Sequence, residues 1–300
     1  MQFKKILCVT KTTCYQTCPI TPASLPKFKR DRLHKEHLYH QHAIEKAKQQ
    51  AIKYNLNITF IADQDLTQLV CKKYDLVLTL GGDGTFLTTA HYTKDTPILG
   101  INSHPVIAGS RGALLSTTVT KIPQLFNALK NCSLKFSLIR FPRLIATLDQ
   151  KPLPSSALNE IFFGPTEQDK TLEFKITIQN QKVQKVNQSQ RANQSQIVLS
   201  SGAIICTSRG STGWYTNAGG KPFEKSLGIG VLIREPNPTH SLTFSQMIIP
   251  SSSTTTLEWG GQEGFISFDS RREGRYHTDN KRHILTISSS TKEGLWVVKI

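Results

Sequence analysis

The chain has 300 residues, of which 38% are hydrophobic and 19% are charged, enough for one large domain or two ordinary ones with a sizeable core. Its formal net charge of +16 comes from separate basic groups, which are either solvated faces or a diffuse field that attracts phosphorylated small molecules. These groups lack the interleaved aromatic residues of a nucleic-acid platform, and no stretch approaches the roughly 18 apolar residues of a membrane span. The six cysteines show no zinc-binding spacing, and no targeting segment is recognised, so we expect a cytoplasmic protein.

The first part of the chain alternates strand and helix patterns. Strands are expected at residues 3–10, 57–62, 75–80 and 97–102. Helices are expected at residues 37–55, 63–74, from 86 onward and at 122–131. Strands separated by helices favour an α/β domain with a parallel, Rossmann-like sheet. We predict that this domain covers residues 1–135 and that the segment near 291–300 packs back on it.

After about residue 135 the chain changes to short β-type runs broken by turn residues. These runs cover residues 135–148, 172–179, 195–206, 242–249, 254–259, 264–269, 283–289 and 295–300. The pattern predicts a β-rich, sandwich-like second domain over residues 136–290. Within it, the polar segment 180–196 is expected to form an exposed hairpin tip or loop.

The stretch LGGDGTFLTTAHY, residues 80–92, places a glycine-rich turn between an apolar strand and a helix. Free N–H groups at a helix start favour phosphate, and glycine lets the backbone approach it closely. The expected phosphate loop consists of Gly81, Gly82, Gly84 and Thr85. It is neither a Walker A loop nor a G-x-G-x-x-G fingerprint. Asp83 within it is expected to accept a proton or hold a metal in phosphoryl transfer; a turn that uses Gly-Asp-Gly for its backbone angles is the alternative.

Two stretches in the second half carry groups suited to a nucleotide. The loop at residues 200–220 is dense in Gly, Ser and Thr, and Trp214 and Tyr215 offer flat faces for stacking on a purine or nicotinamide ring. The alternative is a tight turn of a β domain. Asn159 and Glu160 begin an apolar run, where the pair can hold the vicinal hydroxyls of a ribose; an ordinary edge position is the alternative.

These three motifs, in this order, resemble those of the NAD kinase family. LGGDGTFL is similar to its catalytic loop, LNEI to its Asn-Glu motif and CTSRGSTGWYTNAGG to its Thr-Pro-Thr-Gly-Ser-Thr loop. PILGIN and FISFDSRREG resemble its Gly-Ile-Asn segment and its late strand ending in Asp-Gly. The resemblance implies the NAD kinase fold and transfer of a phosphoryl group from ATP, or from another nucleotide or polyphosphate, to the 2′-hydroxyl of the adenosine ribose of NAD or NADH. The products would be NADP or NADPH.

The resemblance also implies a divalent metal such as Mg²⁺ that arrives with ATP, a homodimer or homotetramer, and a role for each matching residue. Asp83 would accept the proton of the 2′-hydroxyl in a cleft between the two domains. The dinucleotide would be bound, in part from a neighbouring subunit, by Asn159, Glu160, Ser201, Thr207, Gly210, Ser211, Thr212, Gly213, Trp214, Tyr215, Asn217 and Asp269. No nucleic acid or membrane is expected as a partner.

The chain departs from the family pattern at several positions. Ser201 stands where the family commonly has aspartate, and Trp214 where it has tyrosine. The SSG form that includes Ser201, with VLIREP at residues 231–236, resembles the NADH-kinase branch more closely. The loss of a carboxylate at Ser201 is expected to move preference from cationic NAD toward neutral NADH. Two other functions stay open: a lipid or sphingoid-base kinase that shares the GGDGT loop, and a non-catalytic dinucleotide- or nucleic-acid-binding protein.

Overall fold

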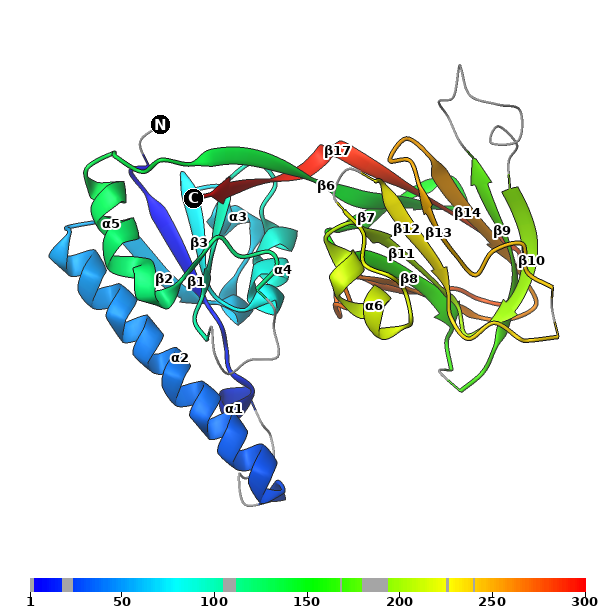
Figure 1. Ribbon diagram of the computed structural model, residues 1–300, viewed down its shortest axis with the longest axis horizontal. Coiled ribbons are helices and arrows are strands. Elements are labelled where there is room, and N and C mark those ends of the chain that lie inside the picture. The colour runs from blue at the N-terminus through cyan, green and yellow to red at the C-terminus, as the bar shows by residue number, and fades with distance from the viewer. Residues whose placement is uncertain are drawn as a thin grey trace. The chain divides into compact units, whose positions relative to one another are not determined.

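The computed structural model describes residues 3–17, 24–104, 112–167, 169–179, 194–224, 227–239 and 241–300. The chain divides into two compact units. Unit 1 comprises Met1–Phe141 and Leu295–Ile300, and unit 2 comprises Pro142–Gly294. Two strands, β6 (Ser137–Leu148) and β17 (His283–Lys299), contain residues of both units (Figure 1).

Unit 1 is built on a parallel sheet with the strand order β2-β1-β3-β4, followed by the end of β17. Its strands are β1 (Ile6–Thr10), β2 (Ile58–Ala62), β3 (Leu76–Gly81), β4 (Ile98–Asn102) and the two-residue β5 (Thr117–Thr118). Every residue of β1 and β3 is buried, as in a sheet that helices cover on both faces. The predicted parallel α/β sheet is therefore confirmed.

The helices of unit 1 cover both faces of this sheet (Figure 1). They are α1 (Cys14–Thr17), α2 (Lys27–Lys53), η2 (Asp63–Asp65), α3 (Gln68–Cys71), α4 (Asp83–Tyr92), η3 (Val119–Lys121) and α5 (Ile122–Lys130). Small residues of α2, such as Ala43 and Ala47, and the apolar face of α5, including Phe126, bury the same side of β1 and β3. The helix α4 contacts β1 and β3 from the other side.

Two of the predicted helices differ from the structure. The helix expected at residues 37–55 begins instead at Lys27, directly after Pro26. The sequence pattern missed its first turns because they are basic and exposed and carry little apolar periodicity. The prediction of a single helix over residues 63–74 was wrong, since only η2 and the short α3 form there. Leu66 and Thr67 are extended, and the Thr67 side chain accepts the N–H of Val70, so a new helix starts at this point.

Unit 2 consists of two antiparallel sheets that enclose one core. The first has the order β10-β9-β14-β17, with β6 and β7 attached, and contains β7 (Lys151–Ala157), β9 (Leu172–Gln179), β10 (Gln194–Ser200) and β14 (Thr254–Trp259). The second has the order β13-β12-β11-β8-β15-β16 and contains β8 (Glu160–Pro165), β11 (Ala203–Thr207), β12 (Ile229–Ile233), β13 (Gln246–Ile249), β15 (Gly264–Phe268) and β16 (Arg275–His277). Phe174 and Leu257 of the first sheet and Phe163 and Ile205 of the second belong to the same buried cluster. The β-rich, sandwich-like unit is confirmed.

The run expected at residues 195–206 is two strands in different sheets. Gly202 has a φ of +117°, and a side chain on it would overlap the carbonyl oxygen of Phe163. The chain therefore turns sharply at Ser201 and Gly202 and crosses from β10 to β11. Of the polar segment 180–196, residues 180–193 lie outside the described residues, and the last three begin β10 rather than a loop.

Candidate functional site

In unit 1, the glycine-rich loop connects the end of β3 to the first turn of α4. Gly82 is the residue before the helix, and Asp83 is its first residue. Gly81 must be glycine because a side chain there would overlap that of Thr85, whereas a side chain on Gly84 would meet nothing within 4 Å. The start of α4 is therefore open beside Gly84, and the N–H groups and dipole at the start of a helix favour a phosphate there.

The Asp83 carboxylate is held by backbone from another loop. Its oxygens accept the N–H of Leu114 at 3.0 Å and that of Ala113 at 3.2 Å. These donors lie about thirty residues further along the chain and have no side-chain signature, so the sequence offered no signal for them. They fix the orientation of a carboxylate at the mouth of the glycine loop.

In unit 2, Asp269 and Thr207 use all the backbone polar groups of the Leu158–Glu160 turn. The Asp269 carboxylate accepts three N–H groups, from Leu158 at 2.9 Å, Asn159 at 2.7 Å and Glu160 at 3.2 Å. The Asp269 N–H donates to the Glu160 carbonyl at 3.0 Å. The Thr207 N–H donates to the Asn159 carbonyl at 2.8 Å, and the Thr207 hydroxyl donates to the Leu158 carbonyl at 2.5 Å. The backbone of the turn is thus fully paired, and only its side chains remain for a ligand.

Asn159 and Glu160, the two side chains predicted to bind a ribose, lie on this turn, and each has one oxygen without a hydrogen-bond partner among the described residues. These two oxygens, Asn159 Oδ1 and Glu160 Oε2, are buried. Glu160 is 4% exposed, and burial, followed by repulsion from Asp269, raises its pKa to about 8. A buried carboxyl without a partner is costly, so a ligand with hydroxyl or amide donors would satisfy it.

The loop after β11 packs directly on this turn. A side chain on Gly210 would overlap the backbone of Asn159, so the loop approaches the turn more closely than any other residue allows. The loop continues as η5 (Gly210–Thr212) and α6 (Trp214–Asn217). The Ser211 hydroxyl is buried and donates to the Ser208 carbonyl at 2.7 Å, which ties the loop to itself.

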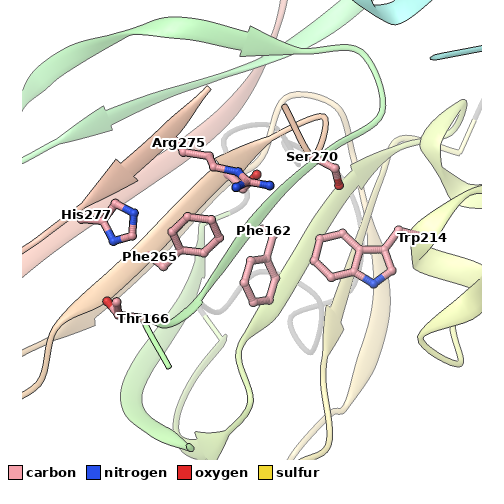
Figure 2. Close-up of a pocket in the computed structure, with 8 residues that line it drawn as sticks. Phe162, Thr166, Trp214, Phe265, Ser270, Arg275 and His277 are labelled. Atoms are coloured by element: carbon pink, nitrogen blue, oxygen red, sulfur yellow. The ribbon is translucent and has the colours of Figure 1, made fainter. Parts of the chain in front are cut away.

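The two aromatic residues of this loop have different surroundings. Tyr215 is fully buried against Phe223, with Gly220 packed on its ring, so it contacts the core rather than open space. Trp214 lies at the edge of a hollow beside Phe162, with ring centroids 4.9 Å apart (Figure 2). The Arg234 guanidinium, which the sequence reasoning missed, lies 5.5 Å from the Trp214 centroid and 5.6 Å from that of Phe162.

The structure gathers most of the predicted dinucleotide-binding residues of unit 2 at one end of β8 and β11. Asn159, Glu160, Thr207, Gly210 and Asp269 are joined by the contacts above, and Gly213 lies beside the Asn159 amide. Ser201 lies at the other end of β11, because it precedes the strand whereas Thr207 is the last residue of the strand. At about 3.4 Å per residue, roughly 20 Å separates the two positions.

The chain thus combines an α/β unit that carries a glycine-rich loop at a helix start with a β-sandwich unit that carries the Asn159–Glu160 turn. Residues 18–133 match the family model described as the ATP-NAD kinase N-terminal domain. The chain is 28% identical over 210 residues to an NAD kinase of Bifidobacterium longum, covering 66% of this chain and 55% of that protein. It is 26% identical over 214 residues to a probable NADH kinase of Oryza sativa, covering 65% of this chain and 62% of that protein.

Two solved structures share the fold over nearly the whole chain. An NAD kinase from Archaeoglobus fulgidus in complex with ATP has a TM-score of 0.65 at 18% identity, covering 98% of this chain and 92% of that one. Yeast NADH kinase complexed with NADH has a TM-score of 0.67 at 17% identity, covering 100% and 84%. The NAD kinase fold and the resemblance to the NAD kinase family are thereby confirmed. The matched part of the first relatives is little more than half of their length.

Proposed function

We propose that this protein is an NAD(H) kinase, which transfers the terminal phosphoryl group of ATP to the 2′-hydroxyl of the adenosine ribose of NAD or NADH. The observation that carries the proposal is Asp83, a carboxylate fixed by two backbone N–H groups at the open start of α4, in a chain with the NAD kinase fold. A phosphate-binding loop that contains one carboxylate suits proton removal during phosphoryl transfer.

In the proposed reaction, Asp83 takes the proton of the 2′-hydroxyl while that oxygen bonds to the γ-phosphorus. The bond from this phosphorus to the bridging oxygen breaks, and ADP leaves with the bond's electron pair. The N–H groups at the start of α4 stabilise the phosphate oxygens, and Gly84 allows their close approach. Ala113 and Leu114 keep the Asp83 carboxylate in place.

A divalent metal such as Mg²⁺ would enter with ATP and neutralise charge on its phosphates. Mg²⁺ is commonly held by one or two carboxylates together with substrate phosphates and water, and Asp83 is a suitable carboxylate. Among the described residues, no group of three or more His, Cys, Asp or Glu side chains is placed to hold a metal ion.

Asn159 and Glu160 would hold the ribose of the acceptor. Glu160, with a pKa of about 8, is mostly protonated at neutral pH, so it can donate a hydrogen bond as well as accept one. The expected contributions of Ser211, Thr212, Gly213, Tyr215 and Asn217 stay predictions, as does the position of the site in a cleft that includes Asp83.

The expected preference for NADH over NAD depends on the absence of a carboxylate at Ser201, but a carboxylate from another residue stands near Ser201. Glu235 hydrogen-bonds to Ser201 and is paired with Arg234 at 3.3 Å, and these contacts lower the pKa of Glu235. The charge expected to be missing is thus replaced, at least in part, from a neighbouring residue. The comparisons include both NAD kinases and NADH kinases.

The assembly and the location of the protein belong to the same proposal. A homodimer or homotetramer, in which each subunit contributes residues to the other's site, follows from the resemblance, and a cytoplasmic location stays a prediction. Within the parts of the chain that the structure describes, no helix combines the length and apolar character needed to cross a bilayer.

The direct test is turnover of NAD and of NADH in separate assays, with ATP and Mg²⁺. A dehydrogenase that requires the 2′-phosphate would report NADP or NADPH. We expect product from at least one dinucleotide and none from a sphingoid base or diacylglycerol. A folded protein that phosphorylates only a lipid, or that binds NAD(H) without turnover, would contradict the proposal.

A further inference from the structure

The last strand of the chain carries a lysine that reaches the loop holding Asp83. The end of β17 joins the sheet of unit 1 beside β4, where Val297 pairs with Ile98. Val298 belongs to the buried cluster of unit 1, and Lys299 is the last residue of the strand and only partly exposed. The packed end of β17 therefore gives the Lys299 side chain a fixed starting point in unit 1.

The Lys299 ammonium donates to two consecutive backbone carbonyls of that loop. Its Nζ lies 3.1 Å from the Leu114 carbonyl oxygen and 2.8 Å from that of Leu115. It also lies 5.7 Å from the centroid of the buried Phe141 ring. An ammonium has three N–H bonds, so two of them are used on this loop. Hydrogen bonds from a charged donor are stronger than those between neutral groups, so Lys299 holds the loop more firmly than a neutral side chain would.

Leu114 lies between this ammonium and the Asp83 carboxylate. Its N–H donates to Asp83 at 3.0 Å, and its carbonyl accepts from Lys299 at 3.1 Å. A single residue thus donates to an anion and accepts from a cation. Because hydrogen bonds in such a chain polarise one another, loss of the cation should also weaken the hold on the carboxylate.

The other contacts of the loop fix its end rather than its turn. The Leu115 N–H donates to the Gly112 carbonyl at 3.1 Å, which closes a turn within the loop itself. The Ser116 hydroxyl donates to the Val298 carbonyl at 2.6 Å and so joins the end of the loop to β17. Lys299 joins the turn to the same strand, directly beside the N–H groups that hold the carboxylate.

We propose that Lys299 is a positioning residue, which fixes the loop at residues 112–116 so that its N–H groups orient the Asp83 carboxylate. The proposal rests on the proposed function in taking Asp83 as the group that removes the hydroxyl proton. Lys299 acts through the loop and not on the substrate, because its ammonium is directed at the loop carbonyls. Without the ammonium the carboxylate samples more orientations, so kcat falls while binding by unit 2 is unaffected.

The test compares the full chain as wild type, Lys299→Met, Lys299→Arg and the control Lys130→Met. Methionine keeps an apolar side chain but removes the ammonium, whereas arginine keeps a cation that can donate to both carbonyls. Lys130 is a matched control, because it is an exposed lysine of unit 1 that also donates to a backbone carbonyl, that of Asn55 at 3.4 Å. Each protein is assayed for kcat with NAD and with NADH, for NADH affinity by calorimetry, and for amide hydrogen exchange over residues 112–118.

We expect Lys299→Met to lower kcat about tenfold with NADH affinity unchanged, and Lys130→Met to match wild type. Lys299→Arg should retain most of the activity. The segment 112–118 of Lys299→Met should exchange faster, whereas the amides of β4 stay protected. In an Asp83→Asn background, Lys299→Met should lower kcat no further, because its effect passes through that carboxylate.

Four results would each overturn the assignment. They are wild-type kcat and exchange in Lys299→Met, an equal loss of kcat in Lys299→Arg, an additive loss in the double variant with Asp83→Asn, and NADH affinity that falls in step with kcat. Failure of the proposed function would look different, since wild type would then turn over neither NAD nor NADH. Hydrogen exchange would still decide in that case: faster exchange in Lys299→Met supports the hold on the loop, and unchanged exchange overturns it.

Discussion

The candidate residues of each unit depend on one aspartate, but in opposite ways in the two units. In unit 1 the backbone of another loop holds the Asp83 carboxylate, with two N–H groups from Ala113 and Leu114. In unit 2 the Asp269 carboxylate holds a loop, by accepting three N–H groups from the Leu158–Glu160 turn. The first arrangement fixes a carboxylate beside the glycine loop, and the second uses a carboxylate to position the side chains of Asn159 and Glu160. A change at Asp83 should therefore affect chemistry, and a change at Asp269 should affect geometry and binding.

The largest effect on the fold is expected for Gly210→Ala. The new methyl group would overlap the carbonyl group and Cα of Asn159, and the fully paired turn leaves that backbone little room to move. Strain of this kind typically costs about 1–3 kcal/mol of unfolding free energy. Denaturant unfolding and calorimetric binding of NADH should both show the loss. A variant with wild-type stability and affinity would contradict the close packing of the loop on the turn.

Gly84→Ala is the matched change in unit 1. Its methyl group would meet nothing within 4 Å, and Gly84 is the second residue of α4, so alanine should leave stability unchanged or raise it by about 0.5–1 kcal/mol. The KM for ATP should nevertheless rise, because the methyl group would occupy the space proposed for phosphate. Unchanged ATP kinetics would show that phosphate does not approach this residue.

Asp269→Asn should weaken dinucleotide binding about tenfold while leaving the unit folded. The amide can still accept hydrogen bonds through its oxygen, but its NH₂ group would oppose one of the three donors, and hydrogen bonds to charged groups contribute about 1.5–3 kcal/mol. KM should therefore rise more than kcat falls. Asp169→Asn, an exposed carboxylate of the same unit, is the control and should behave as wild type.

A pH profile separates this role from a general loss of structure. The charge of Asp269 contributes to the raised pKa of Glu160, about 8, after the larger contribution of burial. In Asp269→Asn the inflection of NADH binding that reports Glu160 should move to lower pH. A profile identical to that of wild type would mean that Asp269 does not act on Glu160.

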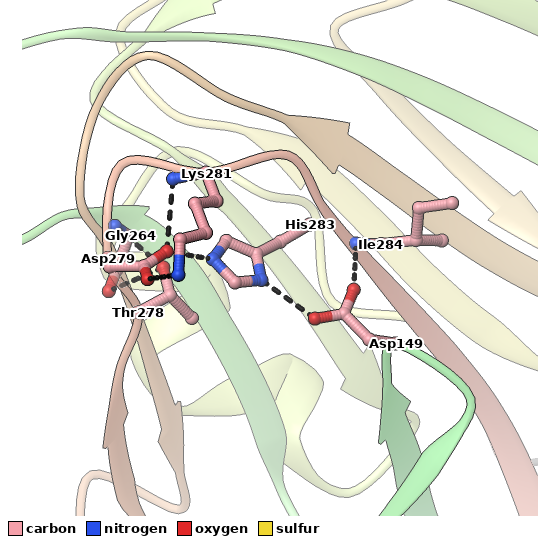
Figure 3. Close-up of polar contacts among 7 residues, drawn as sticks. All are labelled: Asp149, Gly264, Thr278, Asp279, Lys281, His283 and Ile284. Carbon is pink, nitrogen blue, oxygen red and sulfur yellow. Dashed lines mark hydrogen bonds and ion pairs between the residues drawn. The ribbon is translucent and has the colours of Figure 1, made fainter.

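The smallest effect concerns an ion-pair network away from the site (Figure 3). His283 Nδ1 lies 2.7 Å from Asp149 Oδ2 and His283 Nε2 lies 2.8 Å from Asp279 Oδ1, while Asp149 Oδ1 accepts the N–H of Ile284 at 2.8 Å. Burial lowers the pKa of His283, but its hydrogen bonds to the two carboxylates outweigh burial and raise it. The network joins the turn between β6 and β7 to the start of β17.

The stabilisation from the raised pKa of His283 is complete below its unfolded pKa, about 6.5, and is lost as pH rises through the folded value. The two carboxylates have lowered pKa values, so their share is lost as pH falls through those values instead. The difference in Tm between wild type and His283→Gln should therefore be largest near about pH 5–6 and shrink at alkaline pH. His42→Gln, a change at an exposed histidine of unit 1, should show no such trend. A gap that widened with pH would contradict this account of the network.

The candidate residues of the two units also differ in how far the sequence predicts their surroundings. The loop from β3 to α4 is local, since an apolar strand, three glycines and a helix follow one another, and its place in the fold was predictable. The Leu158–Glu160 turn is not local, because its partners Thr207 and Asp269 lie 49 and about 110 residues further on. Asp269 entered the predicted site only through its resemblance to a family motif, which did not indicate that it pairs with backbone.

The residues that line the hollow beside Trp214 had no signal of their own (Figure 2). Two of them, Phe265 and Arg275, belong to short strands whose alternation predicts one buried and one outer face, but not which loop leaves that face uncovered. The sequence likewise gives no signal for the position of Arg234. This residue directly follows the buried strand β12, and nothing in that pattern predicts that its guanidinium lies over Trp214. Periodicity predicted the elements of both units, whereas long-range pairing decided what surrounds the site.

The central claim is that Asp83 performs the chemistry while unit 2 binds the dinucleotide. It is tested most directly by measuring NADH affinity and turnover side by side on wild type and Asp83→Asn. Asparagine keeps an oxygen for one of the two N–H groups, from Ala113 and Leu114, and opposes the other with its NH₂ group, and it cannot take the hydroxyl proton. We predict unchanged NADH affinity and a kcat lowered by about 10²–10⁴. An Asp83→Asn protein that turns over at the wild-type rate, or that loses NADH affinity in step with activity, would contradict the claim.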